Sequence, residues 1–94
     1  MTLEEFRKSL TSDAPPSGLS QVLEALWFDA KGDWGRAHAV AQAVGGRNGA
    51  WVHAYLHRKE GDLSNAGYWY SKAGRRQPYG SLEAEWEELL RALL

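Results

Sequence analysis

Cysteine is absent from the 94 residues, which excludes a disulfide scaffold, a thiolate zinc site and a cysteine nucleophile. No apolar run approaches the roughly 18 residues that a transmembrane helix needs. The stretch from Met1 to Glu5 is acidic, whereas a signal peptide begins with positive charge, so we expect a cytoplasmic protein. Basic and acidic residues number 11 and 12, so the chain lacks the excess positive charge of a nucleic-acid binder. We therefore expect neither nucleic acid nor a membrane as a partner.

Recognisable catalytic motifs are also missing. The segment Gly45 to Gly49 is rich in glycine, but it lacks the Gly-Lys-Ser/Thr ending and the preceding strand of a phosphate-binding loop. We interpret it as a turn between two helices. No nucleophile elbow is present either. These absences favour a protein without enzymatic activity.

Aromatic residues are unusually frequent, with five Trp and four Tyr in a chain whose hydrophobic content, 44%, is ordinary for a globular domain. A small domain can gain buried area from a few large rings. Exposed rings are also common at protein interfaces, and such a face would allow a homodimer. Composition alone does not choose between a dense core and an adhesive surface.

Apolar residues recur at helical spacing along the chain, which predicts a single all-α domain over residues 1–94. The expected elements are an N-terminal helix over 3–10, a helical hairpin over 19–45, a second hairpin over 49–74 and a C-terminal capping helix over 81–93. Thr2 and Ser81 precede the outer helices, and Asp33 and Asp62 follow a glycine inside each hairpin, so we expect all four to be N-caps.

The two hairpins repeat each other at an offset of 29 residues. The identical pairs are Ala25 with Ala54, Gly32 with Gly61, Asp33 with Asp62, Ala37 with Ala66, and Gly45 with Gly74. These identities fall at caps and close-packing positions, where a helical hairpin restricts the choice of residue. The pattern indicates an internal repeat.

This spacing resembles the tetratricopeptide class of helix-turn-helix repeats. The second unit carries the small, Gly-acidic and aromatic positions of that class at Ala54, Gly61, Asp62, Ala66, Tyr70, Ala73 and Pro78, with His57 at an aromatic position. The first unit matches at Ala25, Phe28, Gly32, Asp33, Trp34 and Ala37, and has Ala41 where the later aromatic belongs. Both units are shorter than the usual length of about 34 residues, and only two are present. The block from Trp51 to Tyr70 also resembles segments of small uncharacterised bacterial proteins, which implies no activity.

The resemblance implies stacked hairpins that present a groove to a peptide or helix, closed at the ends by the flanking helices. Aromatic residues at such a face would be Trp51, Tyr55, Tyr68 and Trp69. The alternative is that Tyr68 and Trp69 pack under the C-terminal helix.

Positive charge offers a second way to hold a partner. Arg47, Arg58 and Lys59 can form a basic lip that grips an acidic side chain or a C-terminal carboxylate. The alternative is weak surface pairing with the glutamates over 83–88.

The sharpest candidate for site chemistry is on the third expected helix. His53, His57 and Glu60 are spaced i, i+4 and i+7, so they project from one face and can hold zinc or another divalent metal. His38 on the preceding helix can reach the same groove. The alternative is that His57 packs in the core as the repeat's aromatic residue, with His53 and Glu60 half-exposed.

The leading hypothesis is a helical-repeat interaction module, without a cofactor, that binds a peptide or helix, or a second copy of itself. The rival is a small metal- or ligand-binding protein, including an enzyme, built on His53, His57 and Glu60.

Overall fold

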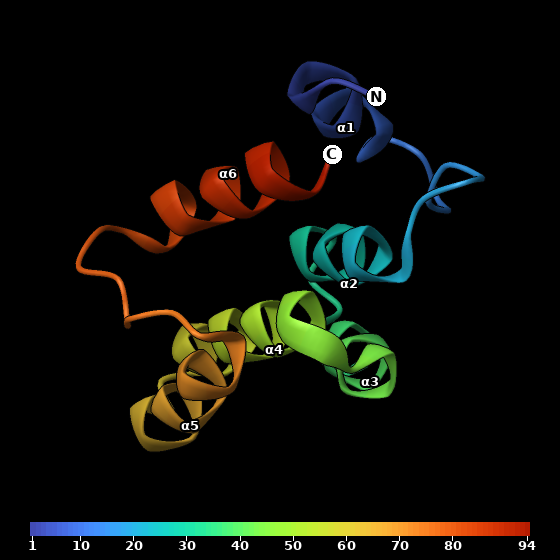
Figure 1. The fold of residues 1–94 in the computed structure, drawn as a ribbon. Coiled ribbons are helices and arrows are strands. Elements are labelled where there is room, and N and C mark those ends of the chain that lie inside the picture. Colours follow the sequence, from blue (N-terminus) through green and yellow to red (C-terminus); the bar gives the residue numbers. More distant parts are fainter.

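The computed structural model describes all 94 residues and consists of six α-helices without a strand, so the expected all-α class is confirmed. The helices are α1 (Leu3–Ser9), α2 (Gln21–Ala30), α3 (Trp34–Val44), α4 (Gly46–Glu60), α5 (Leu63–Ala73) and α6 (Leu82–Leu93) (Figure 1). None of them combines the length and apolar character that a membrane span requires.

The outer helices start where their capping residues predict. The Thr2 hydroxyl accepts from the backbone N–H of Glu5 at 3.1 Å, and the Glu5 carboxylate accepts from the backbone N–H of Thr2 at 2.8 Å. Ser81 caps α6 by accepting from the backbone N–H of Ala84 at 3.0 Å. Ser20 caps α2, which therefore begins two residues later than the sequence pattern predicts. A capping side chain satisfies a backbone donor that the first helical turn leaves free.

The turns inside the two hairpins, α2–α3 and α4–α5, have the same construction. Asp33 and Asp62 each accept from the backbone N–H three residues later, both at 3.1 Å. Their own N–H groups donate to a carbonyl five residues earlier, at 2.9 and 3.0 Å. The preceding Gly32 and Gly61 have φ values of 87° and 90°. Each Gly-Asp pair therefore ends one helix and begins the next.

The connection between the hairpins is shorter than expected, because α4 begins at Gly46 and not at residue 49. Gly45 and Gly46 have φ values of 71° and 69°, a region that side chains with a Cβ rarely adopt. This glycine pair reverses the chain within two residues, so Arg47 to Gly49 join the helix. No side chain caps the first turn of α4.

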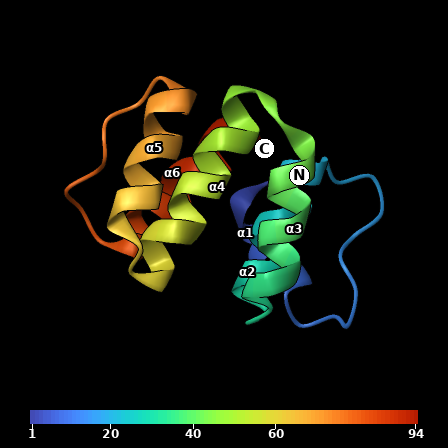
Figure 2. The same cartoon turned by 90° about the horizontal axis from the view of Figure 1, so that it is seen from below.

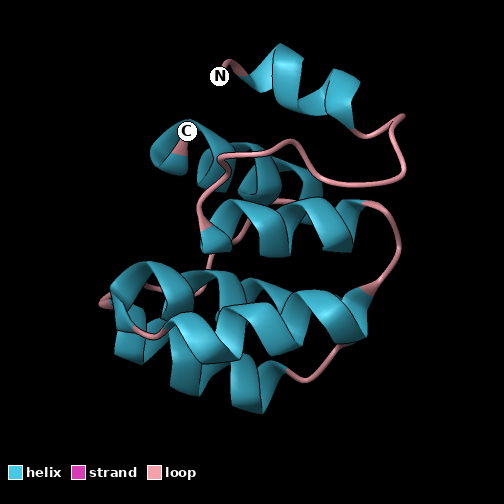
Figure 3. Cartoon of the chain, turned by 90° about the vertical axis from the view of Figure 1, so that its right-hand side faces the viewer, coloured by secondary structure: helices cyan, strands magenta, loops and turns pink.

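Helix α4 is the centre of the arrangement and contacts α2, α3, α5 and α6. The two hairpins lie side by side (Figure 2), while α6 crosses α2 and α4 and α1 covers α6 (Figure 3). Phe6 of α1 is fully buried, with its ring 6.0 Å from that of Trp86. The indole N–H of Trp27 donates to the Ser9 hydroxyl at 3.2 Å and fastens α1 to α2.

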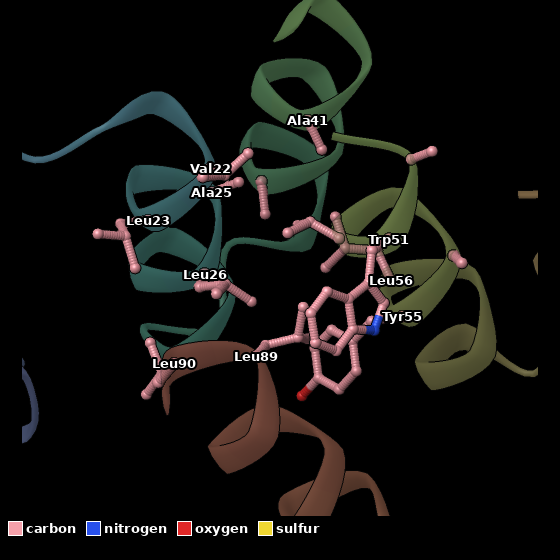
Figure 4. Packing of buried hydrophobic residues seen from close by; sticks show 14 of the residues in the cluster. Val22, Leu23, Ala25, Leu26, Ala41, Trp51, Tyr55, Leu56, Leu89 and Leu90 are labelled. Atoms are coloured by element: carbon pink, nitrogen blue, oxygen red, sulfur yellow. The ribbon is translucent and has the colours of Figure 1, made fainter. Parts of the chain in front are cut away.

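Twenty buried hydrophobic residues form one continuous core. Leu89 and Leu90 of α6 point toward the side chains of α2 and α4 (Figure 4). Most of the large rings belong to this core: Phe6, Trp27 and Tyr70 are among its most completely buried side chains. The high aromatic content therefore serves mainly to gain buried area in a small domain.

Candidate functional site

All three histidines of the chain meet at one point between α3 and α4. The ring of His38 lies 4.6 Å from that of His53 and 5.0 Å from that of His57, and the last two rings are 4.8 Å apart. One nitrogen of each ring lies within 4.8 Å of the others. His53 and His57 are buried and His38 is half-buried. The i, i+4 spacing on α4 predicts the first pair, and the short α3–α4 connection supplies the third ring.

Glu60 takes a different position from the one expected. Its carboxylate lies 2.7 Å from Nδ1 of His57, behind that ring, and does not join His53. An ionised carboxylate only accepts hydrogen bonds, so Nδ1 of His57 carries a proton. Nε2 of a neutral His57 is then an acceptor, and the side-chain amide nitrogen of Asn65 lies 3.3 Å from it. Glu60 therefore sets the tautomer of His57. Its exposed neighbour Asp62 serves as the N-cap of α5.

Two tryptophans enclose the histidine cluster. Trp69 stacks on His53 with ring centroids 4.0 Å apart, and Trp34 stacks on His38 at 4.9 Å. Trp34 is fixed by its indole N–H, which donates to the Leu56 carbonyl at 2.8 Å. The expected packing of Trp69 under α6 is wrong, because its ring lies on His53 and lines the hollow between α3, α4 and α5.

These surroundings hold two of the imidazoles in the neutral form. Burial, followed by the nearby His38 and His57, lowers the pKa of His53 to about 4. Burial likewise lowers the pKa of His38 below its usual value of 6.5, with His57 as the second cause. Nε2 of His38 and Nε2 of His53 are 2.9 Å apart, so one donates to the other.

A hollow of about 380 Å³ lies next to the cluster, between the end of α3, the start of α4 and α5. Its lining includes Arg47, His53, Trp69 and Lys72. Arg47 and Lys72 are exposed, and neither forms an ion pair. We name this hollow, with these four residues, the basic groove. Arg47 and Trp69 are among the expected partner-binding residues. Lys72 is not among the expected partner-binding residues. Its position three residues after Trp69 nevertheless places both side chains on one face of α5.

The other expected aromatic contacts lie elsewhere. Trp51 and Tyr55 are only 4% and 3% exposed, so their rings form part of the core and not of a surface face. They lie on the side of α4 that α6 covers (Figure 4). Tyr68 is 56% exposed, with the ammonium group of Lys72 5.5 Å from its ring.

Arg58 and Lys59 are not free to grip a ligand. Arg58 pairs with Glu85 at 2.9 Å, and Lys59 pairs with Asp29 at 3.1 Å. Both carboxylate side chains are 1% exposed. Withdrawing the cation from a buried carboxylate leaves an unpaired buried charge, which costs about 3–5 kcal/mol. These pairs therefore belong to the framework of the fold.

Glu85 is a buried hub that the sequence pattern did not reveal. Its two carboxylate oxygens accept from the hydroxyl of Tyr70 at 2.8 and 2.7 Å, and Oε2 accepts from the indole N–H of Trp51 at 3.3 Å. Burial, followed by hydrogen bonding to Glu85, raises the pKa of Tyr70. Burial and the charges of Asp29 and Glu85 raise that of Tyr55. The position of Glu85 between Leu82 and Leu89 on the inward face of α6 was the available clue.

Two further hollows, of about 400 and 300 Å³, are lined mostly by charges that already have partners, with Arg76 in the larger and Glu83 in the smaller as the unpaired residues. In the larger one, Arg75 lies 3.5 Å from the Trp51 ring and pairs with Glu88 at 3.0 Å. The smaller one contains the Asp29–Lys59 pair. The basic groove therefore differs from both in having two unpaired cations and no carboxylate in its lining.

No known protein family matches the chain, and no curated protein or solved structure shows significant similarity to it. Its function must therefore follow from the geometry of its own sites.

Proposed function

We propose that this chain is a small helical-repeat interaction module that binds a carboxylate-bearing peptide segment of a partner protein in the basic groove. The observation that carries the proposal is the hollow beside Trp69, in which Arg47 and Lys72 have no carboxylate partner. Binding, and not catalysis, is the proposed role.

The construction of the hairpins supports a repeat of the tetratricopeptide type. Equivalent Gly-Asp turns recur at an offset of 29 residues, with matching hydrogen bonds at Asp33 and Asp62. Stacked hairpins of this kind form concave surfaces that receive an extended segment or a helix. Here the concave surface is formed by α3, α4 and α5.

Three features of the groove favour a negatively charged group. The guanidinium of Arg47 can hold a carboxylate through two parallel hydrogen bonds, and Lys72 adds a second positive charge. The first turn of α4 has no side-chain cap, so its backbone N–H groups and helix dipole also favour an anion. Trp69 supplies an apolar wall for the side chain next to that carboxylate.

Peptide selection tests this proposal. The purified protein is exposed to a random peptide library prepared with free C-terminal carboxylates and, in parallel, with amidated ends. We expect enrichment of carboxylate-bearing peptides, from the chain end or from acidic side chains, and a comparison of the two libraries distinguishes these sources. Arg47→Glu and Lys72→Glu should each weaken the selected peptide at least about tenfold. Arg91→Glu changes the same charge on the exposed side of α6 and should leave binding unaltered.

Two results would overturn the proposal. One is selection without any preference for carboxylates. The other is equal loss of binding in the Arg47→Glu and Arg91→Glu variants, because a diffuse charge effect would then explain it. Sedimentation of the protein without peptide measures whether it associates with itself. A dimer that Arg47→Glu dissociates would assign the groove to a second copy of the chain in place of a peptide.

A further inference from the structure

We propose that His38, His53 and His57 form a binding site for a divalent transition-metal ion of the zinc class, in which Glu60 holds His57 in the coordinating tautomer. This inference does not require peptide binding, although His53 also lines the basic groove. It rests on the arrangement of the three rings, on the hydrogen bond behind one of them and on the rigid aromatic shell around them.

The ligand set consists entirely of imidazoles from two helices. Every histidine of the chain is in the cluster, so no other ring in the protein competes for the ion. One nitrogen from each ring lies within 4.8 Å of the other two. Three imidazoles around one point are a recognised zinc environment, and nitrogen ligands select zinc, cobalt, nickel or copper over magnesium and calcium.

The distances fit an ion after a small adjustment. Imidazole nitrogens bound to a tetrahedral zinc at about 2.0–2.1 Å lie about 3.4 Å apart. The Nε2 atoms of His38 and His53 are 2.9 Å apart, so these rings need to separate by about half an ångström. That contact already requires one Nε2 to carry no proton, which is the state in which imidazole binds a metal. His38 is half-buried and lies on a different helix from the other two, so this small shift can occur at His38 while the buried pair on α4 stays in place.

The hydrogen bond behind His57 is the second element of the site. Glu60 accepts from Nδ1 of His57 at 2.7 Å and directs the unprotonated Nε2 away from itself. A carboxylate in this position orients a metal-bound histidine and increases its basicity. Asn65 makes the longest polar contact of the cluster, 3.3 Å to the same ring, and is the group that an ion would displace.

The aromatic shell limits ring motion and keeps bulk water away. Trp69 covers one face of His53, and Trp34 covers one face of His38 while its edge faces His57 at 5.9 Å. Trp34 is itself anchored to the Leu56 carbonyl. An apolar shell of this kind strengthens binding because the ligands are already oriented before the ion arrives.

The test is a titration of tag-free, chelator-treated protein with Zn²⁺ by calorimetry, with Co²⁺ as an optical probe and Mg²⁺ as the control ion. We expect one Zn²⁺ or Co²⁺ per chain and no Mg²⁺. His38→Gln should bind Zn²⁺ at least about 100-fold more weakly, because one of three ligands is lost, and Glu60→Gln should bind about tenfold more weakly. Gln42→Ala, one turn further along α3 and in the groove wall, should bind Zn²⁺ as the unaltered protein does.

Circular dichroism of each variant separates loss of ligands from loss of fold, and His38→Gln is the variant expected to fold best because His38 is only half-buried. The inference is overturned if the unaltered protein binds no Zn²⁺, or if folded His38→Gln retains its affinity. Arg47→Glu distinguishes metal binding from the proposed peptide binding. It should lose peptide binding and keep the metal, whereas His38→Gln should lose the metal and keep the peptide.

Discussion

The two hairpins have the same type of Gly-Asp turn but differ in the side chains on their first helices. Phe28 and Glu24 of α2 stand at the positions that His57 and His53 occupy in α4, 29 residues later. Phe28 packs as a hydrocarbon, with the guanidinium of Arg36 4.3 Å from its ring. His57 instead has a polar partner at each nitrogen. At these positions α2 therefore has a packing role, whereas α4 carries a polar site on the same framework.

The difference shows that the turn and the helix face are determined separately. A Gly-Asp pair is sufficient to end one helix and cap the next, whatever the neighbouring faces carry. A buried imidazole, in contrast, needs partners from elsewhere in the unit, because a buried polar group without a hydrogen bond is destabilising. Glu60 and Asn65 provide those partners, while the equivalent positions of the first hairpin hold Lys31 and Arg36.

The largest expected effect concerns the attachment of α6 to the second hairpin. Glu85→Ala leaves Arg58 and Tyr70 without their buried partner, so we expect a loss of about 3–5 kcal/mol in the free energy of unfolding. Urea denaturation measures it. Glu83→Ala, on the exposed side of the same turn, should change stability by less than about 0.5 kcal/mol. Equal effects of the two substitutions would show that the hub contributes nothing specific.

Acid sensitivity should arise in the histidine cluster, with the largest contribution from His53 of the second hairpin. The pKa of His53 is about 4 in the folded protein and near 6.5 when unfolded, so the unfolded state binds the additional proton between these values. Stability is therefore complete above pH 6.5 and falls as the pH decreases toward 4, by about 2–3 kcal/mol from this group. Urea denaturation with a chelator present measures the fall. The slope should be shallower in His53→Gln, and an identical slope would contradict the assignment.

Exchanging the equivalent residues tests the comparison directly. Phe28→His places an imidazole beside Lys31 and Arg36, which cannot accept its proton, so we expect a loss of about 2 kcal/mol. The reverse change, His57→Phe, should cost less than about 1 kcal/mol, because Glu60 is partly exposed and can turn to water. Thermal unfolding of both variants measures the asymmetry. Equal losses would mean that the two positions are interchangeable.

Removing the turn caps should have the same modest effect in both hairpins. Asp33→Ala and Asp62→Ala each remove one N-cap, so each should lower the free energy of unfolding by about 1 kcal/mol. Chemical denaturation of the two variants side by side is the measurement. A difference larger than the effect itself would show that the turns are not equivalent.

Local chemistry explains which parts of the fold the sequence predicts. The caps at Thr2, Asp33, Asp62 and Ser81 depend on neighbours within three residues, and all four are confirmed. The glycine pair before α4 ends one helix and begins the next, because Gly45 is the C-cap of α3 and Gly46 starts α4 with positive φ, and the sequence predicts only the ending.

The path of α6 is the part that local patterns do not contain. It packs on α4 and α2, which buries Trp51 and Tyr55 and gives Arg58 a buried partner. From the local sequence, each of these residues fits an exposed position as well as a buried one. The histidine pair on α4 follows from its spacing. The position of Glu60 behind His57 depends on side-chain rotamers, which spacing does not specify.

The burial of Phe6 has a consequence for the order in which the protein opens. A helix of seven residues is too short to persist alone in water, so α1 is ordered only while it is docked. Its main helical neighbour is α6, which Glu85 in turn fastens to α4 and α5, whereas a single side-chain hydrogen bond from Trp27 joins α1 to α2. Amide hydrogens of α1 should therefore exchange with solvent whenever α6 detaches, and never more slowly than those of α6. Hydrogen exchange in α1 therefore shows whether α6, near the C-terminus of the chain, is still attached to α4 and α5.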